Sequence, residues 1–201
     1  MNTDIFLAIL AMDSYNRGYE PGINGLPFPQ FDSNGNVFEE VKLGQAKIIT
    51  DSSVELGLAA TQNAGFYAIA YDVSAVTGFG SNTNVVSYRG LDSLWADLST
   101  FMTALGSPTT PQAELAVSFL RSALNLSAND DPRNAAAIMT GSSLGGGLAG
   151  YVSALYGLGG VLFDPIPFHR GTDTAYLWSQ PQFAAAYPGL KESIYGAFNP
   201  W

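Results

Sequence analysis

The sequence predicts an α/β fold in which a mostly parallel sheet is flanked by helices. Short apolar runs typical of buried strands alternate with longer segments of helical periodicity along the second half of the chain. A glycine-rich turn at residues 141–145 joins one such strand directly to a helix. No repeat or linker interrupts the 201 residues, so we expect one domain, residues 1–201, with a sizeable core.

The composition restricts the class of protein. Only 12% of the residues are charged and the formal net charge is −9, which argues against nucleic acid and anionic membrane surfaces as partners. The absence of cysteine excludes disulfides, thiolate metal sites and a cysteine nucleophile. The N-terminal apolar run is a poor Sec signal and is too short to span a bilayer. We therefore expect no stable membrane insertion, and a location that is either cytoplasmic or reached by a non-Sec route.

The first predicted elements are a helix and a hairpin. Thr3 or Asp4 can cap a helix whose apolar residues form one buried side. Residues 18–45 are rich in glycine, proline, asparagine and aromatics, and the Asp-Ser-Asn-Gly turn at 32–35 predicts a hairpin. This segment could cover a site as a lid, or close an edge of the sheet as a surface hairpin.

The remaining elements alternate between strands and helices. Strands are predicted at residues 46–50, 65–72, 85–90, 136–139 and 159–164. Helices are predicted at 91–105, from Thr110 to about Leu126, and at 146–155. The second helix has the strongest start signal, because a capping threonine is followed by Pro111 and by Glu114 in the first turn.

The turn at 141–145 has the pattern G-x-S-x-G, which is typical of a serine nucleophile on a strand-to-helix turn. A Cβ atom at Gly141 or Gly145 would clash as the helix packs back on the strand. This geometry would expose the Ser143 hydroxyl at the carboxyl end of the strand, next to the free N–H groups that begin the helix.

The same residues fit two other interpretations. Residues 140–147 also read as T-G-x-x-x-G-x-G, the dinucleotide loop of short-chain dehydrogenases, whose Y-x-x-x-K is matched by Tyr187 and Lys191. That loop should follow the first strand of the fold, and Pro188 and Gly189 would break the helix that the Tyr/Lys pair needs. The other interpretation is a glycine-rich turn without chemistry.

A serine nucleophile needs a base, and His169 is the only histidine in the chain. Asp164 ends the preceding strand, so the chain order Ser143, Asp164, His169 matches one order of a catalytic triad. Parallel strands would also bring Arg89, Gly90, Ser143 and Asp164 to the edge where ligands bind. The alternative is that Asp164 belongs to a strand-end turn and His169 to a solvated loop, with the true acid and base absent.

Two linked motifs resemble class 3 lipases and their bacterial secreted relatives, within the α/β-hydrolase superfamily. Residues 85–92 resemble the family's V-V-x-F-R-G-T-x strand, and residues 139–149 resemble its I-T-G-H-S-L-G-G-x-L-A elbow. The similarity covers residues 65–168. It implies an α/β-hydrolase fold, in a minimal or C-terminally shortened version, and hydrolysis of carboxylic esters or acylglycerols without a metal or organic cofactor.

The resemblance also implies roles for individual residues. Ser143 would be the nucleophile, and the backbone N–H groups of Leu144 and Leu91 would form the oxyanion hole. The chain has Ser142 where the family has histidine, and Leu91 where it has threonine or serine. The segment after Ser143 is also shorter than the family's acid and base require. The competing expectation is a truncated, catalytically incomplete hydrolase that binds apolar ligands or forms homo-oligomers.

Overall fold

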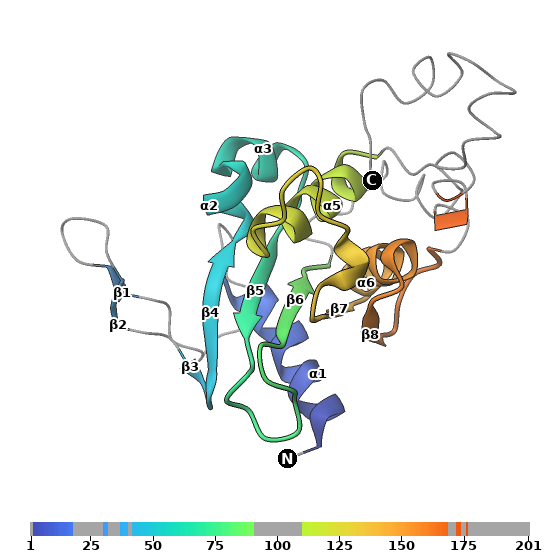
Figure 1. Cartoon of the computed structure of the whole chain (residues 1–201). Coiled ribbons are helices and arrows are strands. Elements are labelled where there is room, and N and C mark those ends of the chain that lie inside the picture. The colour runs from blue at the N-terminus through green and yellow to red at the C-terminus, as the bar shows by residue number, and fades with distance from the viewer. Residues whose placement is uncertain are drawn as a thin grey trace, which may run out of the picture.

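A computed structural model of the chain describes residues 2–17, 30–31, 37–39, 42–90, 110–168, 172–173 and 176. Its centre is a six-stranded sheet with helices packed on both faces (Figure 1). The strand order is β3-β4-β5-β6-β7-β8, so each strand lies beside its neighbours in the chain. The expected α/β class is therefore confirmed.

The strands are β3 (Lys42–Leu43), β4 (Ala46–Asp51), β5 (Ala68–Asp72), β6 (Asn84–Tyr88), β7 (Ala137–Ser142) and β8 (Gly159–Phe163). Only the pairs β6–β7 and β7–β8 are parallel, whereas β3–β4, β4–β5 and β5–β6 are antiparallel. The sheet is mixed, and the prediction of a mostly parallel sheet is wrong.

The connections explain most of this mixed pairing. A tight turn with Gly44 at φ +60° joins β3 to β4, and residues 73–83, which hold no helix, join β5 to β6. A parallel crossover needs a longer connection, usually with a helix, so both pairs form antiparallel. The strands β4 and β5 are also antiparallel although two short helices lie between them.

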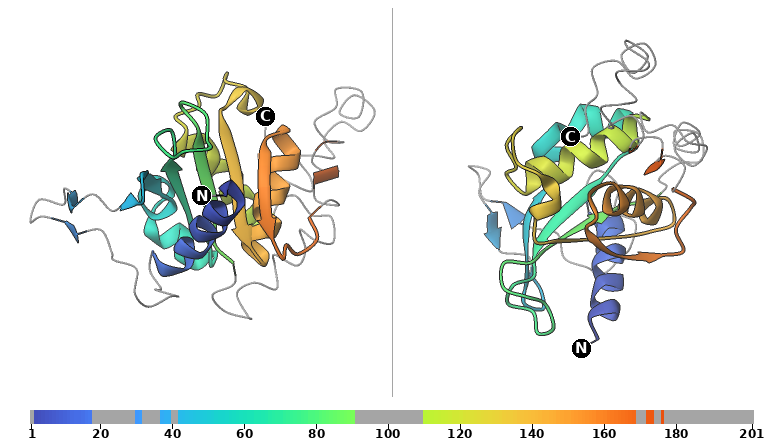
Figure 2. Two further views of the ribbon diagram at one scale, coloured as in Figure 1. Left: turned by 90° about the horizontal axis from the view of Figure 1, so that it is seen from below. Right: turned by 45° about the vertical axis from the view of Figure 1, so that its right-hand side comes forward.

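The helices are α1 (Thr3–Asp13), η1 (Ser14–Asn16), α2 (Ser52–Leu56), α3 (Leu58–Asn63), α5 (Pro111–Ala123), η2 (Pro132–Asn134) and α6 (Leu144–Tyr156). Helix α1 packs on one face of the sheet, and α5 and α6 pack on the other (Figure 2). Thr110 caps α5 as predicted. Helix α1 is capped by Asn2, whose side chain accepts a hydrogen bond from Asp4 N, rather than by Thr3 or Asp4.

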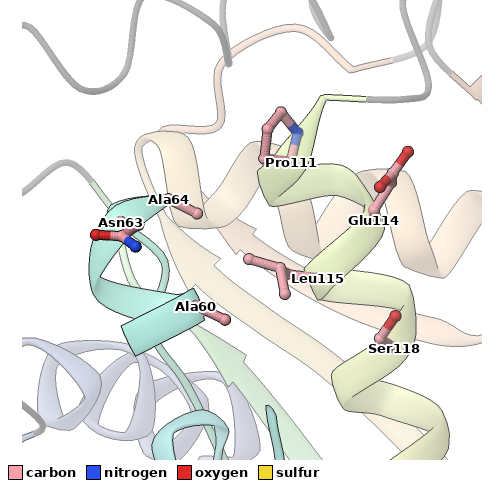
Figure 3. A pocket seen from close by; sticks show the side chains of 7 residues that line it. All are labelled: Ala60, Asn63, Ala64, Pro111, Glu114, Leu115 and Ser118. Carbon is pink, nitrogen blue, oxygen red and sulfur yellow. The ribbon is translucent and has the colours of Figure 1, made fainter. Parts of the chain in front are cut away.

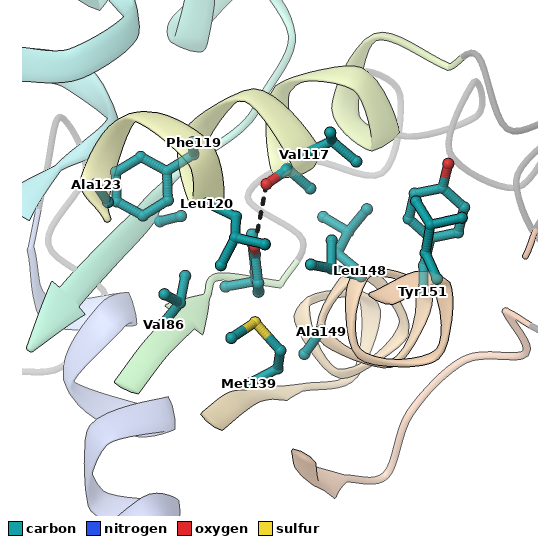
Figure 4. Close-up of a cluster of buried hydrophobic side chains, with 14 of the residues drawn as sticks. Val86, Val117, Phe119, Leu120, Ala123, Met139, Leu148, Ala149 and Tyr151 are labelled. Atoms are coloured by element: carbon teal, nitrogen blue, oxygen red, sulfur yellow. Dashed lines mark hydrogen bonds between the residues drawn. The ribbon is translucent and has the colours of Figure 1, made fainter. Parts of the chain in front are cut away.

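Two hydrophobic cores form because successive side chains of a strand point to opposite faces of the sheet. Val86 and Tyr88 of β6 face α5 and α6, whose Leu120 and Leu148 fill the same core (Figure 4). Val85, which precedes Val86 in the strand, faces the second core, which α1 covers.

The hairpin predicted around residues 32–35 is present. Strands β1 (Gln30–Phe31) and β2 (Val37–Glu39), which flank these residues in the chain, pair antiparallel. They form a separate two-stranded sheet, so the hairpin does not extend the six-stranded sheet, where β3 is the edge strand on that side. The rest of residues 18–41 lies outside the described residues, and its role as a lid stays a prediction. The helix predicted at 91–105 also lies outside them.

The lengths of the helices bear on membrane association. Within the described ranges, none of them combines the length and the apolar character that crossing a membrane would need.

Candidate functional site

Ser143 is the single residue between β7 and α6, and its backbone is strained. Its φ is 54° and its ψ is −121°, a combination that residues with a side chain rarely adopt. Such a conformation costs on the order of 1–3 kcal/mol. This conformation lets the chain pass from strand to helix within one residue. The predicted strand–turn–helix geometry is therefore confirmed.

Glycine is required on both sides of this turn because backbone atoms fill the space that a Cβ atom would need. A Cβ at Gly141 would lie 2.4 Å from the carbonyl oxygen of Gly145. A Cβ at Gly145 would lie 2.1 Å from the carbonyl oxygen of Tyr88, at the end of β6. The elbow is therefore packed against β6 as well as against its own strand.

A second set of glycines lets the segment after β8 approach α6. A Cβ at Gly146 would lie 3.2 Å from Phe163 O, and one at Gly147 would lie 2.8 Å from the Ile166 side chain. One turn later, Gly150 leaves room for the Phe168 ring. Residues 163–168 thus run along the first turns of α6. Sequence reasoning missed this contact, although the spacing of the three glycines on one helix face was a usable signal.

The backbone of Ser143 is held by three hydrogen bonds. Its N–H donates to Phe163 O at 2.9 Å, and its carbonyl oxygen accepts from Gly147 N at 3.0 Å and from Ile166 N at 3.2 Å. Within the described residues, the next N–H along the chain, that of Leu144, makes no hydrogen bond. The Ser143 hydroxyl, which is partly exposed, has no hydrogen-bond partner there either. No described residue therefore forms a hydrogen bond with the hydroxyl of the predicted nucleophile or with the N–H of the predicted oxyanion donor.

The parallel half of the sheet brings the predicted site residues to one edge. Tyr88 is in register with Gly141, and Ser142 is in register with Phe163, so β6, β7 and β8 end together. Arg89 and Gly90, Ser143 and Asp164 follow these three ends directly. The juxtaposition expected from the sequence is present.

Asp164 lies in the turn between the two residues that bond to the Ser143 backbone. Its φ is 46° and its side chain is exposed, without a hydrogen bond to another described residue. His169 and Leu91, the predicted base and second oxyanion donor, lie outside the described residues, as do Tyr187 and Lys191 of the dehydrogenase interpretation. Their roles stay predictions.

A buried charged cluster supports the end of β6. Arg89 is only 4% exposed, and its Nη1 donates to the carbonyl oxygen of Arg17 at 2.9 Å. Arg17 in turn forms a 2.6 Å ion pair with Asp13, which also accepts a 2.7 Å hydrogen bond from the Tyr71 hydroxyl. Burial, and then the nearby Asp13 carboxylate, raise the pKa of Tyr71 well above its ordinary value of 10.0. Sequence reasoning identified Arg89 only as part of a motif and missed its partners.

A hollow of about 450 Å³ lies between α3 and α5 (Figure 3). It is lined by Ala60, Asn63, Ala64, Pro111, Glu114, Leu115 and Ser118. Burial raises the pKa of the Glu114 carboxyl. None of the predicted site residues lines this hollow. Among the described side chains, no group of three or more acidic residues is placed to hold a metal ion.

Comparisons with protein-family models, with curated proteins and with solved structures found no significant match. The described residues define an α/β protein with a strained serine turn at the carboxyl end of a parallel strand. Any assignment of function therefore depends on the geometry of that turn and on the two sequence motifs.

Proposed function

We propose that this protein is a serine carboxylic ester hydrolase in which Ser143 forms the acyl-enzyme. The observation that supports this best is the choice of residue at the strained position. Gly141 and Gly145, which flank the turn, do not have positive φ, whereas Ser143 has φ 54°. A turn with only a structural role would favour glycine at the position of positive φ, because glycine adopts it without steric cost. A serine kept there at a cost is typical of a nucleophile.

The chemistry begins with the Ser143 hydroxyl. Its oxygen attacks the ester carbonyl carbon while its proton passes to a base, and the carbonyl electrons move onto the oxygen to give a tetrahedral oxyanion. When the carbonyl re-forms, the bond to the alcohol breaks and the alcohol leaves with the proton. Water then repeats the sequence on the acyl-enzyme and releases the acid. We assign the base to His169, oriented by Asp164.

The oxyanion needs donors that point at it before the reaction starts. The Leu144 N–H is such a donor, because the peptide group that carries it is fixed at its other end by the two hydrogen bonds to Ser143 O. Those bonds also polarise the peptide group, and the start of the 13-residue helix α6 adds its dipole. We assign the second donor to the N–H of Leu91. Each donor contributes roughly 3 kcal/mol.

A second candidate is the truncated module expected as an alternative, which folds but lacks a working base and binds apolar ligands or itself. The exposure of the Asp164 side chain favours this candidate, because the acid of a catalytic triad is usually buried.

Hydrolysis of p-nitrophenyl butyrate by the full chain separates the two candidates. Ser143→Ala and His169→Ala are compared with Ser118→Ala, a serine on the exposed side of α5. Loss of activity in the first two variants but not in the third supports the proposed hydrolase. Loss in Ser143→Ala alone keeps the nucleophile and rejects His169 as the base. A parent chain without activity, and without labelling of Ser143 by a fluorophosphonate, rejects the proposal in favour of the incomplete module.

A further inference from the structure

The Tyr15 hydroxyl lies between the two chain segments that would supply the oxyanion donors. It donates a 3.1 Å hydrogen bond to the carbonyl oxygen of Ser142, the residue before the nucleophile. A Cβ atom on Gly90 would lie 1.9 Å from the same hydroxyl and 3.0 Å from the same carbonyl oxygen. The phenol therefore contacts the elbow and the residue that precedes the predicted second donor, Leu91.

The position of Tyr15 is fixed by its neighbours in the chain. Asp13 and Arg17, on either side of it, are both buried and joined by the 2.6 Å ion pair. Asp13 is bonded to Tyr71 of β5, and the Arg17 carbonyl is bonded to Arg89, the residue before Gly90. The segment that carries Tyr15 is thus attached to the sheet at two points, one of them at the end of β6.

The hydrogen bond from Tyr15 is one of four that hold two consecutive peptide groups at the turn. In the group that joins Ser142 to Ser143, the carbonyl accepts from Tyr15 and the N–H donates to Phe163 O at 2.9 Å. In the next group, the carbonyl of Ser143 is held by Gly147 and Ile166, and the Leu144 N–H remains for a ligand. Both groups share the Ser143 Cα atom, so a rotation of the first changes the direction of the second.

We propose that Tyr15 is a positioning residue for the oxyanion site. Its hydroxyl fixes the Ser142 carbonyl and sets the spacing between the elbow and Gly90, so that the Leu144 N–H stays directed at the oxyanion. This inference rests on the proposed ester hydrolase function. Because the donors bond most strongly to the oxyanion of the transition state, the Tyr15 hydroxyl should affect kcat and leave KM almost unchanged.

The test is the variant Tyr15→Phe, which removes the hydroxyl and keeps the ring beside Gly90. The matched control is Tyr176→Phe, because Tyr176 is an exposed tyrosine, 59% accessible. With p-nitrophenyl butyrate we expect kcat to fall about 10-fold or more in Tyr15→Phe, with KM within about two-fold, because small displacements of catalytic groups have large effects on rate. The control should retain both constants and the same thermal unfolding midpoint.

A second measurement does not depend on activity. The Ser143 amide is bonded to Phe163 O within the peptide group that Tyr15 holds. Its hydrogen exchange, measured by NMR, should become about 10-fold faster in Tyr15→Phe and stay unchanged in the control. Amides in the middle of α5 should exchange at the parental rate in both variants, which shows that the change is local.

The outcomes separate the inference from the function on which it rests. An active parent chain with unchanged kcat in Tyr15→Phe overturns the inference and keeps the hydrolase. A fall in kcat that only follows a fall in the folded fraction overturns it as well. A parent chain that neither hydrolyses the ester nor reacts with a fluorophosphonate overturns the hydrolase, and with it the role of Tyr15 in positioning the oxyanion site. In that case the exchange rate of Ser143 decides whether Tyr15 fixes the elbow.

Discussion

Replacement of Gly145 by alanine tests whether the turn at residues 141–145 depends on the close approach of α6 to the end of β6. The three nearest atoms to the added Cβ all belong to the backbone of Tyr88 and Arg89, and the closest, Tyr88 O, is 2.1 Å away. Contacts below 3.0 Å are essentially never found, so the start of α6 must move away from β6 by about 1 Å. Such overpacking costs about 1–3 kcal/mol, and the better helix propensity of alanine returns about 1 kcal/mol. We expect a net loss of about 1 kcal/mol.

The same displacement moves the Leu144 N–H, and a misplacement of about 1 Å can lower the rate roughly 100-fold. Urea unfolding of Gly145→Ala gives the stability change, and ester hydrolysis gives the rate. The control is Gly159→Ala in β8, where the nearest atom, in Ile138, is 3.9 Å from the added Cβ and the expected change is within about 0.5 kcal/mol. Equal stability of the two variants would refute the packing argument.

Three further predictions follow from the described contacts. Ser143→Gly should raise the free energy of unfolding in urea by about 1 kcal/mol, because it relieves the positive φ, and should abolish ester hydrolysis; an unchanged or lower stability would count against backbone strain. Tyr71→Phe should lower the free energy of unfolding by about 2 kcal/mol, because it removes a hydrogen bond from the buried Asp13 carboxylate; a loss no larger than in Tyr176→Phe would contradict this. Burial raises the pKa of Tyr71 and Tyr88 in the folded state, so both keep their protons while unfolded tyrosines lose theirs near pH 10. The stabilisation is complete below pH 10 and declines above it by up to about 1.4 kcal/mol per pH unit for each tyrosine, which urea unfolding between pH 9 and 11 can measure; a flat profile would disprove it.

The parts of the fold that could be predicted depend on local chemistry. The cap at Thr110 and the flanking glycines of the elbow follow from short-range sterics and hydrogen bonding, and the structure contains both. The location of Ser143 and Asp164 at the same edge of the sheet could be predicted because each follows an apolar run typical of a strand. These features need only a few neighbouring residues to specify them.

The parts that could not be predicted depend on pairing between distant segments. The antiparallel half of the sheet was missed because a strand's apolar pattern carries no information on its direction. Tyr15 and Ser142 are 127 positions apart, and Asp13 and Tyr71 are 58 apart, so no periodicity connects them. The path of residues 163–168 along α6 likewise becomes evident only when Gly147 and Gly150 are seen against Ile166 and Phe168.

The position of α1 has a consequence for the order in which the chain folds. Strands β3 to β8 each pair with a neighbour in the chain, so the sheet can grow as the ribosome releases it. Helix α1 is synthesised before these strands, yet its main partner is β7, and its Leu10 carbonyl accepts a hydrogen bond from Ser87 of β6. Helix α1 therefore cannot pack fully until β7 has been synthesised. Closure of this long loop brings Tyr15 to the carbonyl of Ser142, so a nascent chain without β7 cannot form the strained serine turn or the hydrogen bond that supports it.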